Sequence, residues 1–451
     1  MDRNHILDDT ITALLKKRDW HELSEISWPA YETASFELAR ELEKMGSKDG
    51  IELLRILPEE LGAAVLSRLS PFIRDPLIFE IPPEEVKVLL SALNPDDRSA
   101  FITELPAASG ERLIAMLPRE DRLETNRLMN FPEDSVGRLM TPDFITVHRT
   151  WSVRQVLKYL RKNGRDSETL SVLYVLDDNG ILEDALTLNS IILSSPDTRI
   201  SQLLDYSVIK VRADEDQEVA VQLMSDYDLL VLPVVDAAGR MEGIVTIDDI
   251  LDVAQEETTE DFQLQAAVKP LGKSYWETGF FRMLGSRAPW LSILILVNLV
   301  SSGIIAAFED ALAASVALAF FIPLLIDTGG NSGSQSAMMI IRALGTGEIR
   351  GNQVVKTILR EIALGALLGL VLGGMGFVLG WFRGGPELGL IIFISLFMIL
   401  TATNLIGVSL PFLLQRFKLD PAAASGPLIT TVADAFGLFI YFTTARIIMG
   451  I

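Results

Sequence analysis

The sequence has no cysteine and only three histidines, His5, His21 and His148, among 451 residues. Zinc, copper and iron–sulfur centres use cysteine or histidine ligands, so such centres are not expected here. A metal bound by this chain is expected to have oxygen ligands, which favours Mg²⁺, Ca²⁺ or Mn²⁺. The first twenty residues lack a long apolar run, so no cleavable signal is expected and the soluble part is expected to stay in the cytoplasm.

The chain has little positive charge in its first part and little charge of either sign in its last part. Residues 273–451 hold 11 basic and 9 acidic residues, which leaves 28 basic and 51 acidic residues for the first 272. Such an acidic part is unsuited to nucleic acid or to an anionic membrane surface, and it suits cations. The hydrophobic residues gather in the last 179 residues, where a membrane domain is expected.

Proline recurs nearly every dozen residues in the first part of the chain, and several of these prolines precede acidic residues. They are Pro58, Pro71, Pro83, Pro95, Pro106 and Pro118. Proline followed by carboxylates is typical of the first turn of a helix, and Asn94 is predicted to cap one of these helices. The segments between them are amphipathic, so an α-solenoid is predicted over residues 8–130, without a catalytic constellation.

Two similar units of about 60 residues follow Met140-Thr141-Pro142. Each is predicted to contain a strand, a helix, a β-hairpin and a second helix, with the hairpins turning at Asn179-Gly180 and Ala238-Gly239. The pair resembles tandem CBS modules, which in general bind adenine nucleotides or metals and regulate a partner domain. The segment GIVTIDDIL, residues 243–251, matches that pattern well.

The first of the two units departs from the CBS pattern. Asp184 replaces a glycine, and Ser190 stands where a ribose-binding aspartate is usual. These changes argue against nucleotide binding by the first copy.

Five segments of the last part are long enough for the ~20 residues that a bilayer requires. They are residues 288–308, 311–341, 362–382, 388–415 and 421–445, and the second is expected to be interrupted at residues 327–331. Basic residues cluster before the first span, between the second and third, and between the fourth and fifth, at Arg282, Arg287, Arg342, Arg350, Lys356, Arg360, Arg416 and Lys418. The positive-inside rule then predicts a multi-pass protein of the cytoplasmic (inner) membrane, with its N-terminus in the cytoplasm and its C-terminus outside.

Two membrane segments carry polar clusters, IDTGGNSGSQS at residues 326–336 and SGPLITTVADAFG at residues 425–437. Asp434 is the sole charged residue among the 25 residues 421–445. A carboxylate there costs ~2.5–3.5 kcal/mol on insertion and indicates an ion path or a catalytic site. The glycines fit either an unwound helix that exposes carbonyl ligands or close helix packing. Close packing does not explain Asp327 and Asp434, so ion binding is favoured.

The motif PLLIDTGGNSGSQS, together with TTVADAFGLFIYF, resembles the MgtE family of magnesium channels, and the resemblance extends over nearly the whole chain. It implies a homodimer in membrane lipid, with one pore on the two-fold axis. It also implies that Asp434 of both subunits holds a hydrated Mg²⁺, with Asn331 and residues near Thr430 lining the path. Asp327 is expected at the cytoplasmic mouth or in a structural hydrogen bond.

The resemblance also implies a set of acidic residues that bind regulatory Mg²⁺. They are Asp96, Asp216, Glu218, Asp228, Asp249, Asp252, Glu257, Glu260 and Asp261. Glu257 and Asp261 are four residues apart on a predicted helix, where like charges repel. Bound Mg²⁺ is expected to neutralise this face and close the pore. Ala64 and Ala100 stand where the family has acidic residues, so cation-dependent docking of the N-terminal domain is expected to be weak.

The predicted architecture is therefore multidomain. A helical N-terminal domain (1–132) precedes an α/β tandem CBS domain (133–255), a connecting amphipathic helix (256–284) and an all-α transmembrane domain of five helices (285–451). The predicted function is Mg²⁺ uptake through a channel that cytoplasmic Mg²⁺ closes, and no enzymatic activity is expected.

Three rival functions remain open from the sequence. A secondary carrier would couple transport of Mg²⁺, Co²⁺ or Mn²⁺ to another ion, and a CBS receptor would transport nothing. An intramembrane aspartic protease is suggested by Asp327-Thr328-Gly329, although that triplet requires a tight turn in a β-fold.

Overall fold

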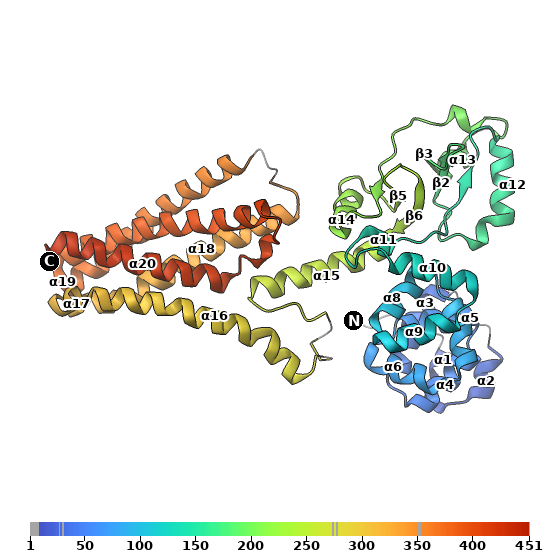
Figure 1. Cartoon of the computed structure of the whole chain (residues 1–451), viewed down its shortest axis with the longest axis horizontal. Helices are drawn as coiled ribbons and strands as arrows, with labels where there is room; N and C mark the ends of the chain where they lie inside the picture. Colours follow the sequence, from blue (N-terminus) through green and yellow to red (C-terminus); the bar gives the residue numbers. More distant parts are fainter. Residues whose placement is uncertain are drawn as a thin grey trace. The chain divides into compact units, whose positions relative to one another are not determined.

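The computed structural model describes residues 9–26, 28, 31–272, 275–276, 278–349 and 353–450. The chain forms two compact units, Met1–Ala254 and Gln255–Ile451 (Figure 1). The first contains the predicted N-terminal and CBS domains, and the second contains the predicted membrane domain. Arg350, one of the predicted cytoplasmic basic residues, lies outside the described residues.

The N-terminal part is a stack of short helices, as predicted. Its members are α1 Asp9–Lys17, α2 Trp20–Ser24, α3 Tyr31–Leu42, α4 Ser47–Ile56, α5 Glu59–Ser67, α6 Pro71–Glu80, α7 Pro83–Ser91, α8 Pro95–Glu104, α9 Ala107–Met116 and α10 Arg119–Met129. Helices two apart in the chain pack together, as α3 does with α5 and α5 with α7, around a leucine-rich core.

Proline begins α6, α7 and α8 and occupies the N-cap of α5, α9 and α10. A missing N–H costs nothing there, since the first N–H groups of a helix have no partner within it. Asn94 holds the N-cap position of α8, but its side chain makes no capping bond. It donates instead to the Glu168 carboxylate at 2.8 Å.

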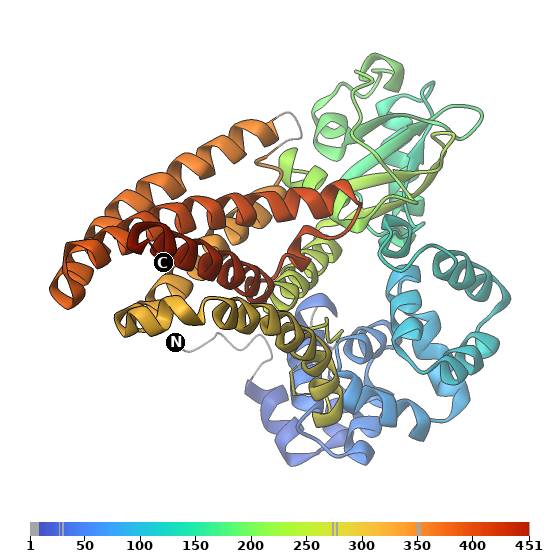
Figure 2. The same cartoon turned by 60° about the vertical axis from the view of Figure 1, so that its left-hand side comes forward.

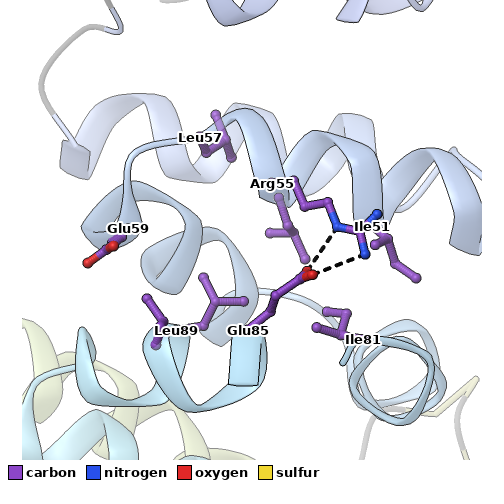
Figure 3. A pocket seen from close by; sticks show the side chains of 9 residues that line it. Ile51, Arg55, Leu57, Glu59, Ile81, Glu85 and Leu89 are labelled. Atoms are coloured by element: carbon purple, nitrogen blue, oxygen red, sulfur yellow. Dashed lines mark hydrogen bonds and ion pairs between the residues drawn. The ribbon is translucent and has the colours of Figure 1, made fainter. Parts of the chain in front are cut away.

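A groove of about 320 Å³ lies between α4, the start of α5 and α7. Its floor is apolar, and Arg55 crosses it to form two hydrogen bonds with Glu85, at 2.9 and 3.1 Å (Figure 3). Both side chains are more than 40% exposed, so this pair contributes little to stability. The groove therefore ties two helices of the stack together and shows no set of catalytic groups.

The two CBS copies have the same topology, as the internal repeat predicts. The first contains β1 Thr146–Val147, α12 Val153–Asn163, β2 Val172–Leu176, β3 Leu182–Thr187 and α13 Leu188–Leu193. The second contains β4 Val211–Arg212, α14 Gln217–Asp226, β5 Val231–Val235, β6 Met241–Thr246 and α15 Ile247–Gln265. In each sheet a parallel pair is followed by an antiparallel hairpin, and the linker helix α11 Val136–Leu139 precedes the first copy. Gly180 and Gly239 turn the hairpins with φ of 80° and 82°.

The second unit contains α16 Phe280–Ala307, α17 Glu309–Ala314, α18 Ile322–Gly345, α19 Val354–Arg416 and α20 Gly426–Met449. A 3₁₀ turn at Val316–Phe321 precedes α18, and another at Pro421–Ala423 precedes α20. Among the described residues, four helical stretches are long and apolar enough to cross a bilayer, namely α16, 316–345, α19 and α20.

Helix α19 accounts for two of the five predicted spans. Its 63 residues would extend ~95 Å, whereas the bilayer core is ~30 Å thick. Gly384 and Gly385 have non-helical backbone angles, and φ of Gly385 is 85°. The chain reverses there into two antiparallel arms, which lie side by side in Figures 1 and 2. The described part of the chain therefore contains five spans, as predicted.

The predicted interruption of the second span is wrong. Helix α18 runs without a break through residues 327–331, and the irregular backbone lies before it, in the 3₁₀ turn. The glycines serve close packing instead. A Cβ at Gly330 would lie 3.1 Å from the Thr430 methyl group, and one at Gly333 would lie 3.0 Å from the Thr403 carbonyl oxygen. Unwound carbonyl ligands are thus absent from this part of the described structure.

The two arms of α19 pack through glycines spaced four residues apart. A Cβ added to Gly365, Gly369 or Gly373 would lie 2.7, 2.7 or 3.0 Å from backbone atoms of the opposite arm. Small residues on one helix face let the backbones of membrane helices approach closely.

We expect Gly369→Ala to destabilise the protein by about 1–3 kcal/mol, because its methyl group would overlap the Phe397 backbone. Gly374→Ala is the matched control, since a Cβ there has no atom within 4 Å. Thermal unfolding of the two full-length variants in detergent checks this, and equal midpoints would contradict the close packing of the two arms.

Candidate functional site

One face of α18 carries an exposed polar stripe. Asp327, Asn331 and Gln335 follow one another at four-residue intervals and are all exposed. The opposite face is buried and consists of glycine, serine and aliphatic residues. Four-residue spacing places the three side chains one above the other over ~12 Å. An apolar membrane helix thus presents polar groups outward from the unit.

Helix α20 packs against α18 and extends this stripe. Thr430 and Asp434 are four residues apart on α20, and both are half-buried. The helices approach closely where Gly330 meets Thr430. Asp434 lies near enough to Asp327 to be repelled by it. The structure therefore places the four predicted pore residues on adjoining faces of two packed helices.

A buried polar layer supports the other face of α18. Ser332 donates a hydrogen bond to Asn404 Oδ1 at 2.5 Å, and Ser336 donates to the Asn404 carbonyl at 3.4 Å. The Asn404 amide reaches the backbone carbonyl of Glu361, which is itself only 8% exposed. These bonds fix the rotation of α18 about its axis, because they hold the serine face inward. The prediction did not include Asn404 or Glu361, although a carboxylate at the start of an apolar span is a visible signal.

Carboxylates also gather between the N-terminal helices and the two CBS copies. Asp96 on α8 is 9% exposed, and its Oδ1 is buried without a hydrogen-bond partner. Asp97, Glu168 and Asp249 are its charged neighbours. The prediction included Asp96 and Asp249 but missed Asp97 and Glu168, which lie far apart in the sequence. The expectation of weak docking counted one carboxylate on the N-terminal side, whereas the structure places two there.

Burial and mutual repulsion raise the pKa values of the carboxylates in this group. Burial raises the pKa of Asp96 well above its usual value, and repulsion from Asp249, Asp97 and Glu168 adds to the shift. Burial, followed by repulsion from Asp249 and Asp248, raises the pKa of Glu168 to about 7. Burial also raises the pKa of Asp249 to about 6. The ionised cluster is therefore held together at a cost that a cation would offset.

A hydroxyl organises the two acids at the start of α15. The Thr246 hydroxyl oxygen lies 2.5 Å from a carboxylate oxygen of Asp248 and 2.8 Å from one of Asp249, so the two carboxylates share its single proton. Asp252, on the same helix, is exposed near them.

The remaining predicted regulatory residues of the second CBS copy are spread over α14. Asp216 caps that helix by accepting from the Glu218 backbone N–H at 2.9 Å, and Asp228 follows the end of the helix. The ten residues of α14 separate Asp216 from Asp228 by ~15 Å, so one ion cannot join Asp228 to Asp216 within one chain.

In the second unit, Glu257, Glu260 and Asp261 occupy the later turns of α15. Burial raises the pKa of Asp261 to about 6, and repulsion from Asp420 and Glu257 adds to it, while Arg342 opposes it. Asp420 precedes α20 and was not predicted. Among the residues that the structure describes, no group of three or more acidic or histidine side chains has the geometry to hold a metal ion.

Comparison with known proteins agrees with this arrangement. The family described as divalent cation transporter matches residues 322–444, the MgtE intracellular N domain matches 34–134, and the CBS domain matches 136–196 and 200–256. The magnesium transporter MgtE of Thermus thermophilus is 42% identical over 328 residues, which are 73% of each chain. The chain belongs to the MgtE family.

A second MgtE relative, from Bacillus subtilis, is 36% identical over 70% of each chain. The crystal structure of the soluble part of a magnesium transporter matches 55% of this chain and 96% of its own, with a TM-score of 0.50 and 24% identity. That likeness supports the fold of the soluble part. This MgtE protein thus has the domain order that its sequence predicted.

We expect the contact between the N-terminal helices and the CBS pair to depend on pH. An acid whose pKa is raised in the contact binds its proton more tightly there than in the separated state. The contact should therefore strengthen as the pH falls through about 6–7 and weaken above it. Spin labels at positions 112 and 162 of the full-length protein, in place of Arg112 and Lys162, measure this contact. In chelator, the distance distribution should be narrow at low pH and broad at high pH. Adding Mg²⁺ at high pH should make the distribution narrow again.

Glu168→Gln removes one of the repelling charges and should reduce this pH dependence. Asp197→Asn removes an exposed surface charge that pairs with Arg154 and should leave it unchanged. A distance distribution that does not respond to pH in the unaltered protein would contradict the role of the cluster.

Proposed function

We propose that this protein transports Mg²⁺ across the cytoplasmic membrane as a channel, with Asp434 holding the ion. The observation that carries the proposal is the polar face formed by Asp327, Asn331, Thr430 and Asp434 on two membrane helices. Relatives of this chain carry the name magnesium transporter, which supports the same function.

The position of this face supports a pore shared by two copies of the chain. A charged side chain within the bilayer costs ~2.5–3.5 kcal/mol when it faces hydrocarbon. Asp327 and Asn331 are nevertheless exposed on the single chain. A second copy related by a two-fold axis would cover them and enclose an aqueous path.

The ligand chemistry favours a hydrated divalent ion. Mg²⁺ loses its water reluctantly and is usually held through one or two carboxylates with several waters kept. Two Asp434 carboxylates facing each other would repel. A hydrated divalent cation between them would offset this repulsion. Asp327 is proposed at the mouth of the path, and Asn331 and Thr430 along its wall.

Cytoplasmic Mg²⁺ is proposed to close this pore through the acidic residues of the soluble part and α15. Asp96, Asp249 and Asp252 would share cations with Asp97 and Glu168. Burial and repulsion already disfavour the charged forms of the four carboxylates other than Asp252. Glu257, Glu260 and Asp261 would act with Asp420. Asp228 lies too far from Asp216 and Glu218 for one ion to join all three, so a second copy would complete their sites.

The proposed orientation places the N-terminus in the cytoplasm and the C-terminus outside. Five spans and the basic residues at their predicted cytoplasmic ends support it. An ion-coupled carrier is the second candidate, because the polar clusters fit either mechanism. Flux in liposomes distinguishes them, since a carrier shows a fixed coupling ratio to a second ion.

We expect Asp434→Asn to lower Mg²⁺ flux into liposomes at least about tenfold, because it removes the paired charge that holds the ion. The variant should fold, since it also relieves the cost of burying a carboxylate. Asp310→Asn is the control, because it removes an exposed charge of α17, outside the polar face. Unchanged flux in Asp434→Asn would overturn the assignment of the pore.

We also expect limited proteolysis of the segment 249–273 to depend on Mg²⁺. Millimolar Mg²⁺ should protect the segment, because neutralised carboxylates allow α15 to pack, whereas a chelator should expose it. Glu257→Ala combined with Asp261→Ala should reduce this difference. Identical digestion with and without Mg²⁺ in the unaltered protein would argue against a cation sensor.

A further inference from the structure

A cavity of about 280 Å³ lies in the second unit where α15 ends and α16 begins. Its walls come from the end of α15 and the loop after it, from residues 285–293 of α16 and from Ala423. Most of the lining is apolar, as at Leu264, Val268, Pro289 and Ile293, and Lys269 adds a charge. Its volume is near the lower end of the ~300–1,000 Å³ of small-molecule pockets. The cavity therefore suits part of a flexible chain rather than a whole large ligand.

Hydrogen bonds hold the walls of this cavity in place. The Lys269 backbone N–H donates to the Ser286 carbonyl at 3.0 Å, and the Leu271 N–H donates to the Gln263 side chain at 2.8 Å. Arg282 donates to the Leu271 carbonyl at 3.2 Å. The loop is thus fixed to both α15 and α16, so the cavity is a built feature.

The wall of the cavity contains two places where a hydrogen bond is missing, at the indole of Trp290 and at Pro289. Trp290 lines the cavity, and its indole nitrogen is buried without a hydrogen-bond partner. An indole N–H is only a donor, so it requires an acceptor. Pro289 has no N–H and cannot bond to the Gly285 carbonyl one turn earlier. The indole nitrogen does not open onto the cavity in this structure, so the carbonyl oxygen of an apolar occupant would reach it after a rotation of the Trp290 side chain.

Aromatic side chains near the cavity indicate the level of the lipid headgroups. Tyr275, Trp276, Phe280 and Phe281 are between 60% and 92% exposed. Exposed aromatic residues beside the start of a membrane helix are typical of the membrane interface. Lys269, Arg282 and Arg287 supply positive charge at the same level, where phosphate groups lie.

We propose that this cavity binds one glycerophospholipid of the cytoplasmic leaflet, with the upper part of an acyl chain between Leu264, Pro289 and Ile293. The phosphate lies beside Lys269, and a rotation of the Trp290 side chain brings its indole N–H to an ester carbonyl. The lipid site requires that the protein is inserted in a membrane, but it does not require that the protein transports Mg²⁺. The lipid proposal and the transport proposal can therefore be disproved independently.

Native mass spectrometry of the full-length protein with phosphatidylglycerol tests this site. Ile293→Trp fills the cavity, and we expect it to lower the population carrying one retained lipid severalfold. Ile295→Trp is the matched control, because Ile295 is an exposed residue of the same helix that does not line the cavity. Lys269→Gln should weaken retention of phosphatidylglycerol without affecting insertion. Equal lipid retention in Ile293→Trp and Ile295→Trp would overturn the proposal.

A photoreactive phosphatidylglycerol, with its diazirine near the ester, identifies the location independently. We expect the labelled peptides to come from residues 264–293. Label spread evenly over α16 and α19 would show contact with bulk lipid only and would overturn the proposal. A photoreactive amino acid at position 293 gives the complementary result. Cross-linking there to a second chain instead of to lipid would show that a partner copy fills the cavity, and would also overturn the proposal.

Discussion

Polar groups in a membrane require polar or aqueous surroundings, and this constraint governs the arrangement of the second unit. Helix α18 satisfies it on its buried face through Ser332, Ser336 and the Asn404 side chain. Its opposite face has Asp327 and Asn331 exposed, so a single chain leaves the requirement unmet. The buried serine layer and the exposed polar stripe are thus linked. When hydrogen bonds hold the serine face of α18 toward the protein, the face that carries Asp327 and Asn331 turns outward.

Electrostatic repulsion has the corresponding role in the first unit. Its helices bury apolar surface on both sides of the acidic cluster, and this burial brings Asp96, Glu168 and Asp249 close together despite their charges. The pairing of Asn94 with Glu168 and of Thr246 with Asp249 shows that neutral donors satisfy part of the cluster. The remaining negative charge of the cluster has no such donor within the described part of the chain. Protons and divalent cations can both neutralise it, and either would strengthen the contact.

The sequence predicted the fold class of each part well because the signals for it are local. Proline spacing indicated the helical stack, a repeat of about 60 residues indicated the CBS pair, and apolar length indicated five spans. The continuity of α18 could not be predicted, since glycine pairs occur both in unwound helices and in close packing, and only the neighbouring backbone distinguishes them. Glu168 and Asn404 were also missed. Each acquires its significance from residues more than 60 positions away, and local patterns do not record such contacts.

The reversal at Gly384 and Gly385 has a consequence for biogenesis. The two arms of α19 are joined by almost no loop, and their faces fit together along glycines. A span that reaches the bilayer alone would expose this glycine face to lipid, and its successor follows without a spacer. The short connection and the matched faces therefore suit insertion of the two arms together as a hairpin. Basic residues stand at both outer ends of that hairpin, at Lys356 and Arg360 before it and at Arg416 and Lys418 after it, so both ends carry the same positive-inside signal.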